Sequence, residues 1–199
     1  MKFLLFSDVH VDRRYCQHLV ALSEQADVVV GAGDFGSLRR GIVKTINWLS
    51  SIKKPTVLVP GNAESYEELV SACSTWPEAV VLHGSACSIA GWSFYGIGGG
   101  IPVTPFGSWS YDFSESQALE LLKDCPTGGI LVSHSPPFGV LDISSGGQHL
   151  GSTAVLQTMQ SRSPRLLVCG HIHESCGQQY EVNGTTVVNA GPEGMFVEL

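Results

Sequence analysis

Short apolar runs alternate with longer amphipathic segments along most of the chain. The runs are rich in Val, Leu, Ile and Phe, which favours buried β-strands, and the segments between them place apolar residues on one side at helical spacing. This alternation predicts β-α-β units built around a parallel sheet. The predicted strands of this part are residues 2–7, 27–31, 56–59, 129–133 and 165–169, and the predicted helices are residues 14–25, 38–51, 64–73, 114–123 and 152–161.

Two stretches depart from the alternation and consist of strands only. In the second of them Asn183-Gly184 is the strongest two-residue hairpin signal that a sequence can carry. No linker, internal repeat or low-complexity stretch interrupts the chain, so we expect one domain over residues 1–199. The additional strands are expected at residues 79–82, 86–90, 92–97, 177–182, 185–189 and 195–199.

A long loop without a regular pattern follows the predicted strand at 92–97. It begins at Gly98 and carries Phe106, Trp109 and Tyr111. A loop of this length inside a compact domain is usually functional or mobile. Two interpretations have equal weight: the aromatic side chains stack on a nucleobase or cover a pocket, or they pack as an ordinary surface loop.

The charge balance limits the classes of partner. The formal net charge is −7 with neutral histidines, and no basic tail is present. Long nucleic acid is therefore disfavoured, because its binding rests on neutralisation of phosphates by basic side chains. A small phosphorylated ligand stays compatible with this charge, since a metal site reverses the local potential.

The N-terminal apolar run and the cysteines bear on the cellular compartment. Residues 3–6 are too short a run for the core of a signal peptide or for a membrane span. The 6 cysteines form no Cys-x-x-Cys pair, and a chain of 199 residues can build a core without disulfides, so we expect them to be reduced and buried. We expect a cytoplasmic protein without membrane association.

Five predicted strands are each followed at once by residues that can bind a metal ion. Loops at the carboxyl ends of parallel strands gather along one edge of a sheet, so we expect these side chains to converge. Taken singly, Gly33-Asp34 and Gly61-Asn62 are ordinary turn dipeptides. Gly170-His171-Ile172-His173 is more telling, because alternate residues of an extended segment place both imidazoles on one side. Together the segments predict a metal site, and its candidate ligands are Asp8, His10, Asp34, Asn62, His134, His171 and His173.

The chemistry of this set favours a pair of divalent cations. Carboxylate, imidazole and amide ligands without thiolate suit Mn²⁺ first, with Fe or Zn²⁺ as alternatives, better than a Mg²⁺ site or a structural zinc site. Seven ligands are too many for one ion but suit two ions about 3.5–4 Å apart. Two such ions against two carboxylates form a positive centre that attracts a phosphate and lowers the pKa of a bridging water. We therefore expect a small phosphorylated substrate.

The order of these motifs resembles that of the calcineurin-like metallophosphoesterases, whose signature runs D-x-H, G-D, G-N-H-[DE], H and G-H-x-H. Asn189-Ala190-Gly191 near the C-terminus also resembles a feature of that family. The resemblance implies an α/β fold, a four-layer αββα sandwich of two mixed sheets with the site at their edge. The matching segments are Asp8-Val9-His10, Gly33-Asp34, Gly61-Asn62-Ala63-Glu64, His134 and Gly170-His171-Ile172-His173.

The resemblance also implies a role for each matching position. Asp12 and Glu64 are further candidates for contacts behind the ligands. The catalytic residues, acting through metal and phosphate activation, would be Asp34, Asn62 and His134. The implied ligands are Asp8, His10 and His173 for the first metal ion, Asn62, His134 and His171 for the second, and Asp34 as the bridge between them.

Ala63 is the departure from the family pattern, which usually has His at this position. In the family that His lies near the phosphate and stabilises charge or protonates the leaving group, and alanine can do neither. Family members altered here, such as the G-N-C-D type, are often small phosphodiesterases. The resemblance therefore favours hydrolysis of small or nucleotide-like phosphodiesters over a phosphomonoesterase or protein phosphatase.

One alternative of another class is a non-catalytic, protein-binding scaffold on the same fold. The small size of the chain and Ala63 favour it, whereas the complete set of candidate ligands argues against it. The sequence leaves the oligomeric state open.

Overall fold

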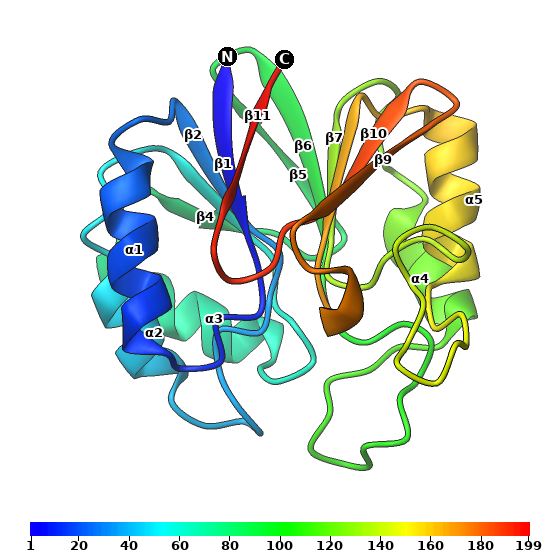
Figure 1. Ribbon diagram of the computed structural model, residues 1–199, viewed down its shortest axis with the longest axis horizontal. Helices are drawn as coiled ribbons and strands as arrows, with labels where there is room; N and C mark the ends of the chain where they lie inside the picture. Colours follow the sequence, from blue (N-terminus) through cyan, green and yellow to red (C-terminus); the bar gives the residue numbers. More distant parts are fainter.

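The computed structural model describes residues 1–199 as two β-sheets packed face to face with helices on both outer sides (Figure 1). The strands are β1 (Lys2–Phe6), β2 (Val28–Gly31), β3 (Thr56–Leu58), β4 (Ala79–Val81), β5 (Ser85–Ile89), β6 (Trp92–Ile97), β7 (Ile130–Ser133), β8 (Leu166–Cys169), β9 (Gln178–Val182), β10 (Thr185–Asn189) and β11 (Met195–Glu198). The helices are α1 (Arg13–Ser23), α2 (Ile42–Leu49), α3 (Tyr66–Ala72), α4 (Glu115–Leu122) and α5 (Thr153–Arg162), with short 3-10 turns η1 (Cys73–Thr75) and η2 (His173–Ser175).

Both sheets are mixed, as the expected αββα sandwich requires. The first has the order β11-β1-β2-β3-β4, in which only β11 is antiparallel to its neighbour. The second has the order β5-β6-β7-β8-β10-β9, a parallel centre flanked by antiparallel β5 and β9. The sandwich is confirmed, but alternation of strands and helices predicted one parallel sheet. It missed the division because the chain changes sheets between β4 and β5 within three residues, Leu82-His83-Gly84.

Strands buried on both faces explain why the apolar runs are continuous. Phe3 and Leu5 point between the sheets, where they pack with Val132 and Val168 of the second sheet. Leu4, from the other face of β1, packs in the layer formed with the helices of the first sheet. Helices α1 to α3 cover the first sheet, and α4 and α5 cover the second (Figure 1).

One predicted helix begins later than expected. We predicted a helix over 38–51, but α2 starts at Ile42. Leu38 and Arg39 have φ values of 48° and 63°, and Gly41 has a φ of 82°, so the backbone forms a turn that an α-helix excludes. The turn leaves Leu38 exposed instead of packed along a helix.

The carboxyl ends of β1, β2, β3, β7 and β8 lie along the same edge of the sandwich, the lower edge in Figure 1. The long loop between β6 and α4 extends beyond this edge, and the two termini lie together at the opposite one (Figure 1). None of the helices is both long enough and apolar enough to cross a membrane.

Candidate metal centre

All seven candidate ligands meet at this edge of the sandwich. Two groups have ligand atoms within 4.8 Å of one another: Asp8, His10 and His173 form the first group, and Asp8, Asp34 and His134 form the second. Asn62 and His171 join the second group. The Oδ1 atom of Asn62 lies 3.2 Å from Nε2 of His134, and the rings of His134 and His171 have centroids 4.9 Å apart.

Backbone hydrogen bonds beyond the strands bring the first two loops together. The N–H of Asp8 donates to Gly33 O (2.9 Å), and the N–H of His10 donates to Asp34 O (3.0 Å). Asp8, His10 and Asp34 have φ values of 56°, 42° and 60°, as does His171 at 68°. Non-glycine residues in this left-handed region cost about 1–3 kcal/mol each, and such strain clusters at functional sites. The strained turns are part of what directs the ligands toward one another.

The glycines of these motifs stand where a side chain has no room. A Cβ on Gly61 would lie 2.0 Å from Oδ1 of Asp34, and one on Gly170 would lie 2.4 Å from Oδ2 of Asp8. Both contacts are far below van der Waals distance. Glycine therefore allows the neighbouring loop to place its carboxylate in the centre.

Two of the histidines are held with one specific nitrogen free. Nδ1 of His134 lies 2.7 Å from Ala32 O, and Nδ1 of His10 lies 3.1 Å from Gly36 O. A carbonyl oxygen only accepts, so Nδ1 donates in both rings, which leaves Nε2 as the nitrogen that a neutral imidazole would offer to a cation. These Nε2 atoms face the centre, where that of His10 lies 3.3 Å from Nε2 of His173.

Asp34 lies between the two groups with one oxygen toward each. Its Oδ1 is 3.5 Å from Nε2 of His134, and its Oδ2 is 3.6 Å from Nε2 of His10. The N–H of Ala63 also donates to Oδ1 (2.8 Å), which fixes the orientation of the carboxylate. A carboxylate in this orientation would be able to contact a cation on each side.

The donor set fits divalent cations in charge as well as in position. Asp8 and Asp34 are buried, and their ion pairs are with histidines, not with Lys or Arg. Burial, together with the neighbouring His134, lowers the pKa of His171 to about 3. Burial opposes ionisation of Asp8, but contact with His173 and other histidines still lowers the pKa of Asp8 to about 2. Both residues are thus in the protonation state that metal binding needs.

Glu64 supports the centre from behind rather than within it. The carboxylate is buried and accepts four backbone N–H groups, those of Asp34 (2.9 Å), Phe35 (3.2 Å), Gly36 (2.8 Å) and Gly61 (2.7 Å). Burial and the nearby charge of Asp34 raise the pKa of Glu64 to about 7, while these N–H groups act in the opposite direction. The single side chain joins the loop after β2 to the loop after β3.

Asp12, the other residue considered for this supporting role, lies outside the centre. It caps α1 by accepting from Arg14 N (2.7 Å) and pairs with the guanidinium of Arg14 (2.8 Å). The cysteines are all free, as expected, although Cys87 and Cys176 are only partly buried.

Ser110 is a supporting residue that sequence reasoning missed. Nδ2 of Asn62 donates to Ser110 Oγ (3.0 Å), and Ser110 Oγ donates to Asp112 (2.7 Å). With its NH₂ group engaged in this way, the Asn62 amide turns Oδ1 toward His134. Ser110 is 48 residues from Asn62 along the chain, and no local pattern signals the contact.

A cavity of about 350 Å³ opens beside the second group of ligands, and we call it the aromatic cavity. Phe106 and Trp109 stack in its wall with ring centroids 5.6 Å apart and planes 12° apart. Tyr111, by contrast, packs against His83 and Phe113 away from this wall. The lining residues are His10, Asp34, Ser37, Leu38, Asn62, Ala63, Phe106, Trp109, Ser144, Leu150, His171, Ile172, His173 and Glu174.

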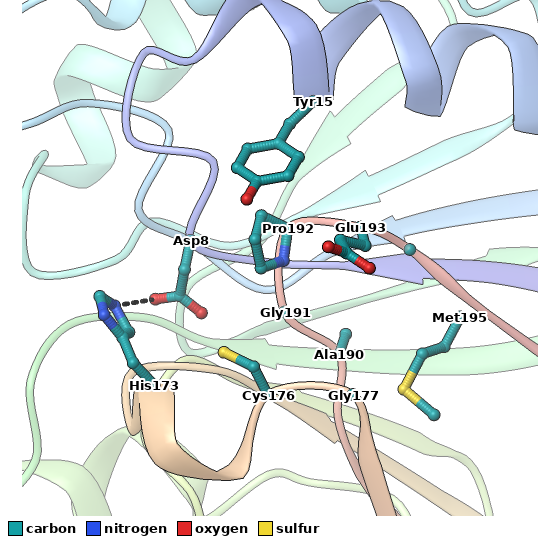
Figure 2. Close-up of a pocket in the computed structure, with 11 residues that line it drawn as sticks. Asp8, Tyr15, His173, Cys176, Gly177, Ala190, Gly191, Pro192, Glu193 and Met195 are labelled. Carbon is teal, nitrogen blue, oxygen red and sulfur yellow. Dashed lines mark ion pairs between the residues drawn. The ribbon is translucent and has the colours of Figure 1, made fainter.

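A larger cavity of about 580 Å³ also adjoins the centre, and we call it the Tyr15 cavity. Asp8 and His173 line one end of it, and the dashed contact in Figure 2 joins these two residues. The sequence did not predict this cavity, because its walls come from segments far apart along the chain. Besides Asp8 and His173, the lining residues are Tyr15, Cys176, Gly177 and residues 190–195.

Comparison with known proteins agrees with the fold and the motifs. Residues 1–196 match the model of the calcineurin-like phosphoesterase superfamily domain. The human Metallophosphoesterase domain-containing protein 1 is 36% identical over 138 residues, covering 67% of this chain and 39% of the human one. This chain thus spans about two fifths of that relative's length. An uncharacterised protein of Methanocaldococcus jannaschii is 28% identical over 183 residues, covering 86% of this chain and 80% of that protein.

Solved structures with low identity share the fold. A dimetal phosphatase from Danio rerio superposes with a TM-score of 0.63 at 15% identity, covering 96% of this chain and 88% of the other. A protein of Thermus thermophilus gives a TM-score of 0.73 at 21% identity, covering 96% and 90%. With strand-end motifs in the family order, two mixed sheets and a family match along nearly its whole length, the chain belongs to the calcineurin-like phosphoesterase superfamily.

Proposed function

We propose that this protein is a metal-dependent phosphodiesterase that hydrolyses small, nucleotide-like phosphodiesters. The seven side chains at the sheet edge would bind two divalent cations, Mn²⁺ first and Fe or Zn²⁺ as alternatives. Bound there, such ions supply a water of lowered pKa and polarise the phosphate. The observation that carries the proposal is that these ligands adjoin a cavity lined by the stacked rings of Phe106 and Trp109 and by Ala63, which stands where the resemblance implies a histidine.

The chain's own residues supply positioning and charge. His10 and His134 offer Nε2 because backbone carbonyls hold Nδ1. Asp34 directs one oxygen to each side, and Asn62 is oriented by Ser110. A centre positioned in this way needs little reorganisation when a phosphate binds, which is where most of the catalytic effect of such sites arises.

The aromatic cavity contains no group able to protonate a leaving group. Glu174 is its one ionisable side chain besides the candidate ligands, and hydrogen bonding to backbone N–H lowers its pKa, so it is a carboxylate at neutral pH. A leaving group must therefore depart without a proton from this wall. Esters with a stable leaving anion should therefore react fastest, and a nucleoside alkoxide would have to take its proton from solvent water.

Exposed apolar side chains around the aromatic cavity support a planar ester group. Phe106 is 50% exposed and Leu38 is 59% exposed, although both lie beside the polar ligands. Stacking of a base on an aromatic side chain is worth about 1–3 kcal/mol. A nucleobase or another aromatic ring would cover this apolar surface.

The experiment that tests the proposal compares a diester with a monoester on one preparation. Protein loaded with Mn²⁺ is assayed on bis(4-nitrophenyl) phosphate and on 4-nitrophenyl phosphate, with metal content measured in parallel. We expect a higher kcat/KM for the diester. Preference for the monoester would identify a phosphomonoesterase, and less than one ion per chain without hydrolysis of either ester would indicate a scaffold.

The Ala63→His variant tests the leaving-group argument directly. An imidazole at this position should raise hydrolysis of a diester with an alkyl leaving group by about a hundredfold, the low end of general acid catalysis. Hydrolysis of the 4-nitrophenyl ester should change far less, because 4-nitrophenolate departs without a proton. Ala63→Gln is the matched control, since it adds a polar side chain without an acid. Equal effects of the two variants would contradict the argument.

A further inference from the structure

Two cavities adjoin the candidate metal centre, and His173 lines both of them. Asp8 and His173 line one end of the Tyr15 cavity, and Met195 lies toward the other (Figure 2). Its volume of about 580 Å³ is within the range of about 300–1,000 Å³ typical of small-molecule sites. A phosphate at the centre would therefore have two separate open spaces next to it.

This arrangement matches the two ester groups of a phosphodiester. One ester group, the leaving one, would occupy the aromatic cavity next to Ala63. The second would then extend past His173 into the Tyr15 cavity. A monoester has no group to place there, so the second cavity matters only for a diester.

The lining of the Tyr15 cavity sets the chemistry of that second group. No Lys or Arg lines it, and its charged side chain away from the metal centre is Glu193. Glu193 is exposed and forms no ion pair within the chain. Its carboxylate only accepts hydrogen bonds and repels anions. A second phosphate is therefore disfavoured in this cavity.

Tyr15 and Glu193 together offer an aromatic ring and a carboxylate to one occupant. Both residues also line a smaller hollow next to the cavity, with Arg14 and His18. The guanidinium of Arg14 does not offset Glu193, because it pairs with Asp12 at 2.8 Å. An ammonium group binds to aromatic faces and to carboxylates, which are the two features present here.

We propose that the Tyr15 cavity binds the second ester group of the substrate and selects one that carries an ammonium group, as in an amino-alcohol phosphodiester. The inference rests on the phosphodiesterase activity proposed above. Tyr15 and Glu193 are specificity residues in this arrangement, and the bond that breaks stays on the side of the aromatic cavity.

Two chromogenic diesters that differ only in an amine test this selection. They are 4-nitrophenyl 2-aminoethyl phosphate and 4-nitrophenyl ethyl phosphate, assayed on the metal-loaded protein. We expect the aminoethyl ester to have the higher kcat/KM. The ratio of the two values should fall about fivefold in Glu193→Gln and about threefold in Tyr15→Leu. Glu198→Gln, an exposed change on the neighbouring strand β11, should leave the ratio unchanged.

A binding measurement separates the cavity from catalysis. The chain has 3 methionines, of which Met195 lines the cavity and Met159 is buried elsewhere. Zn²⁺-loaded protein labelled with ¹³C at the methionine methyl groups is titrated with 2-aminoethyl methyl phosphate, whose alkyl groups leave poorly. We expect the Met195 signal to shift and the Met159 signal to stay. Glu193→Gln should weaken the shift.

The outcomes separate failure of the inference from failure of the proposed function. If neither chromogenic diester is hydrolysed by metal-loaded protein, the phosphodiesterase proposal fails. If both diesters are hydrolysed and Glu193→Gln changes the ratio of their kcat/KM values no more than Glu198→Gln does, the selection for ammonium is overturned. If the Met195 signal does not shift on titration with 2-aminoethyl methyl phosphate, the selection for ammonium is overturned independently of turnover.

Discussion

The two groups of candidate ligands share Asp8 but differ in how firmly the fold holds them. In the buried group, the side chain of His134 is 0% exposed and that of Asp34 is 6% exposed, and both have backbone partners. In the open group, the side chain of His173 is 60% exposed, and that of His10, although its Nδ1 donates to Gly36 O, is 32% exposed. His173 starts the short turn η2 and lies at the junction of the two cavities.

The difference in exposure indicates that the two groups of ligands would bind their cations with different stability. A buried, hydrogen-bonded set keeps its geometry without a cation, so it can retain an ion for long periods. An exposed set is reached by water, by substrate and by exchanging ions. We expect the buried position to anchor the centre and the open one to meet the substrate. Four experiments test this contrast.

Asp34→Asn should have the largest effect because Asp34 faces both groups. The amide removes one of the two carboxylate charges at the centre. We expect kcat for bis(4-nitrophenyl) phosphate to fall by more than about a hundredfold, the upper end of the cost of removing a partner of a metal ligand. Elemental analysis should show loss of bound metal. The control is Asp27→Asn, which changes an exposed side chain that accepts from Lys2 N (2.8 Å). Normal activity of Asp34→Asn would refute the bridging role.

Glu64→Ala should destabilise the buried side by leaving four backbone N–H groups without an acceptor. We expect the free energy of unfolding to fall by about 3 kcal/mol, which corresponds to about 6–12 °C in Tm for a chain of this size. Thermal unfolding of metal-free protein measures this effect. Glu67→Ala, an exposed change in the first turn of α3, should have little effect. Equal shifts in the two variants would contradict the supporting role.

Ser110→Ala should have a smaller effect that is specific to the orientation of Asn62. Without the hydroxyl, the amide is free to rotate, and we expect kcat to fall about tenfold while the protein keeps its fold. Ser108→Ala, an exposed change two residues away in the same loop, controls for general disturbance of the loop. Unchanged kcat in Ser110→Ala would show that His134 and Asp34 orient the amide without it.

Brief chelation should have the smallest effect, the loss of one ion per chain. We expect the open group to release its cation first and the buried group to retain its cation in a slower phase. Metal content and activity are followed against time of dialysis with a chelator. In His173→Ala the fast phase should be missing. A single phase that releases both ions together would remove the contrast between the groups.

The strand-end ligands could be predicted because the inference needs only a local pattern, the apolar run, and the topology of a parallel sheet. Apolar runs mark buried strands, and parallel strands bring their carboxyl ends to one edge wherever they lie in sequence. That is why Asp8 and His171, which are far apart along the chain, were expected together and are found in contact, with the N–H of His171 donating to Asp8 (3.1 Å).

Contacts set by tertiary packing alone could not be predicted. No sequence pattern around Ser110 indicates that it orients Asn62. No pattern around Glu64 indicates that its carboxylate accepts four N–H groups from two loops. The Tyr15 cavity requires α1, η2 and the segment before β11 to come together. Hydrophobic pattern encodes which residues are buried, but it does not encode which buried surfaces face each other.

The backbone and the side chain of Ala63 have different roles. Its N–H holds Asp34, and its carbonyl accepts from Arg39 N (3.0 Å), whereas its methyl group only faces the aromatic cavity. Any residue with this backbone conformation would preserve both contacts. Position 63 is therefore a point at which evolution, or a saturation library, can change the range of accepted esters while the cation sites are inherited intact.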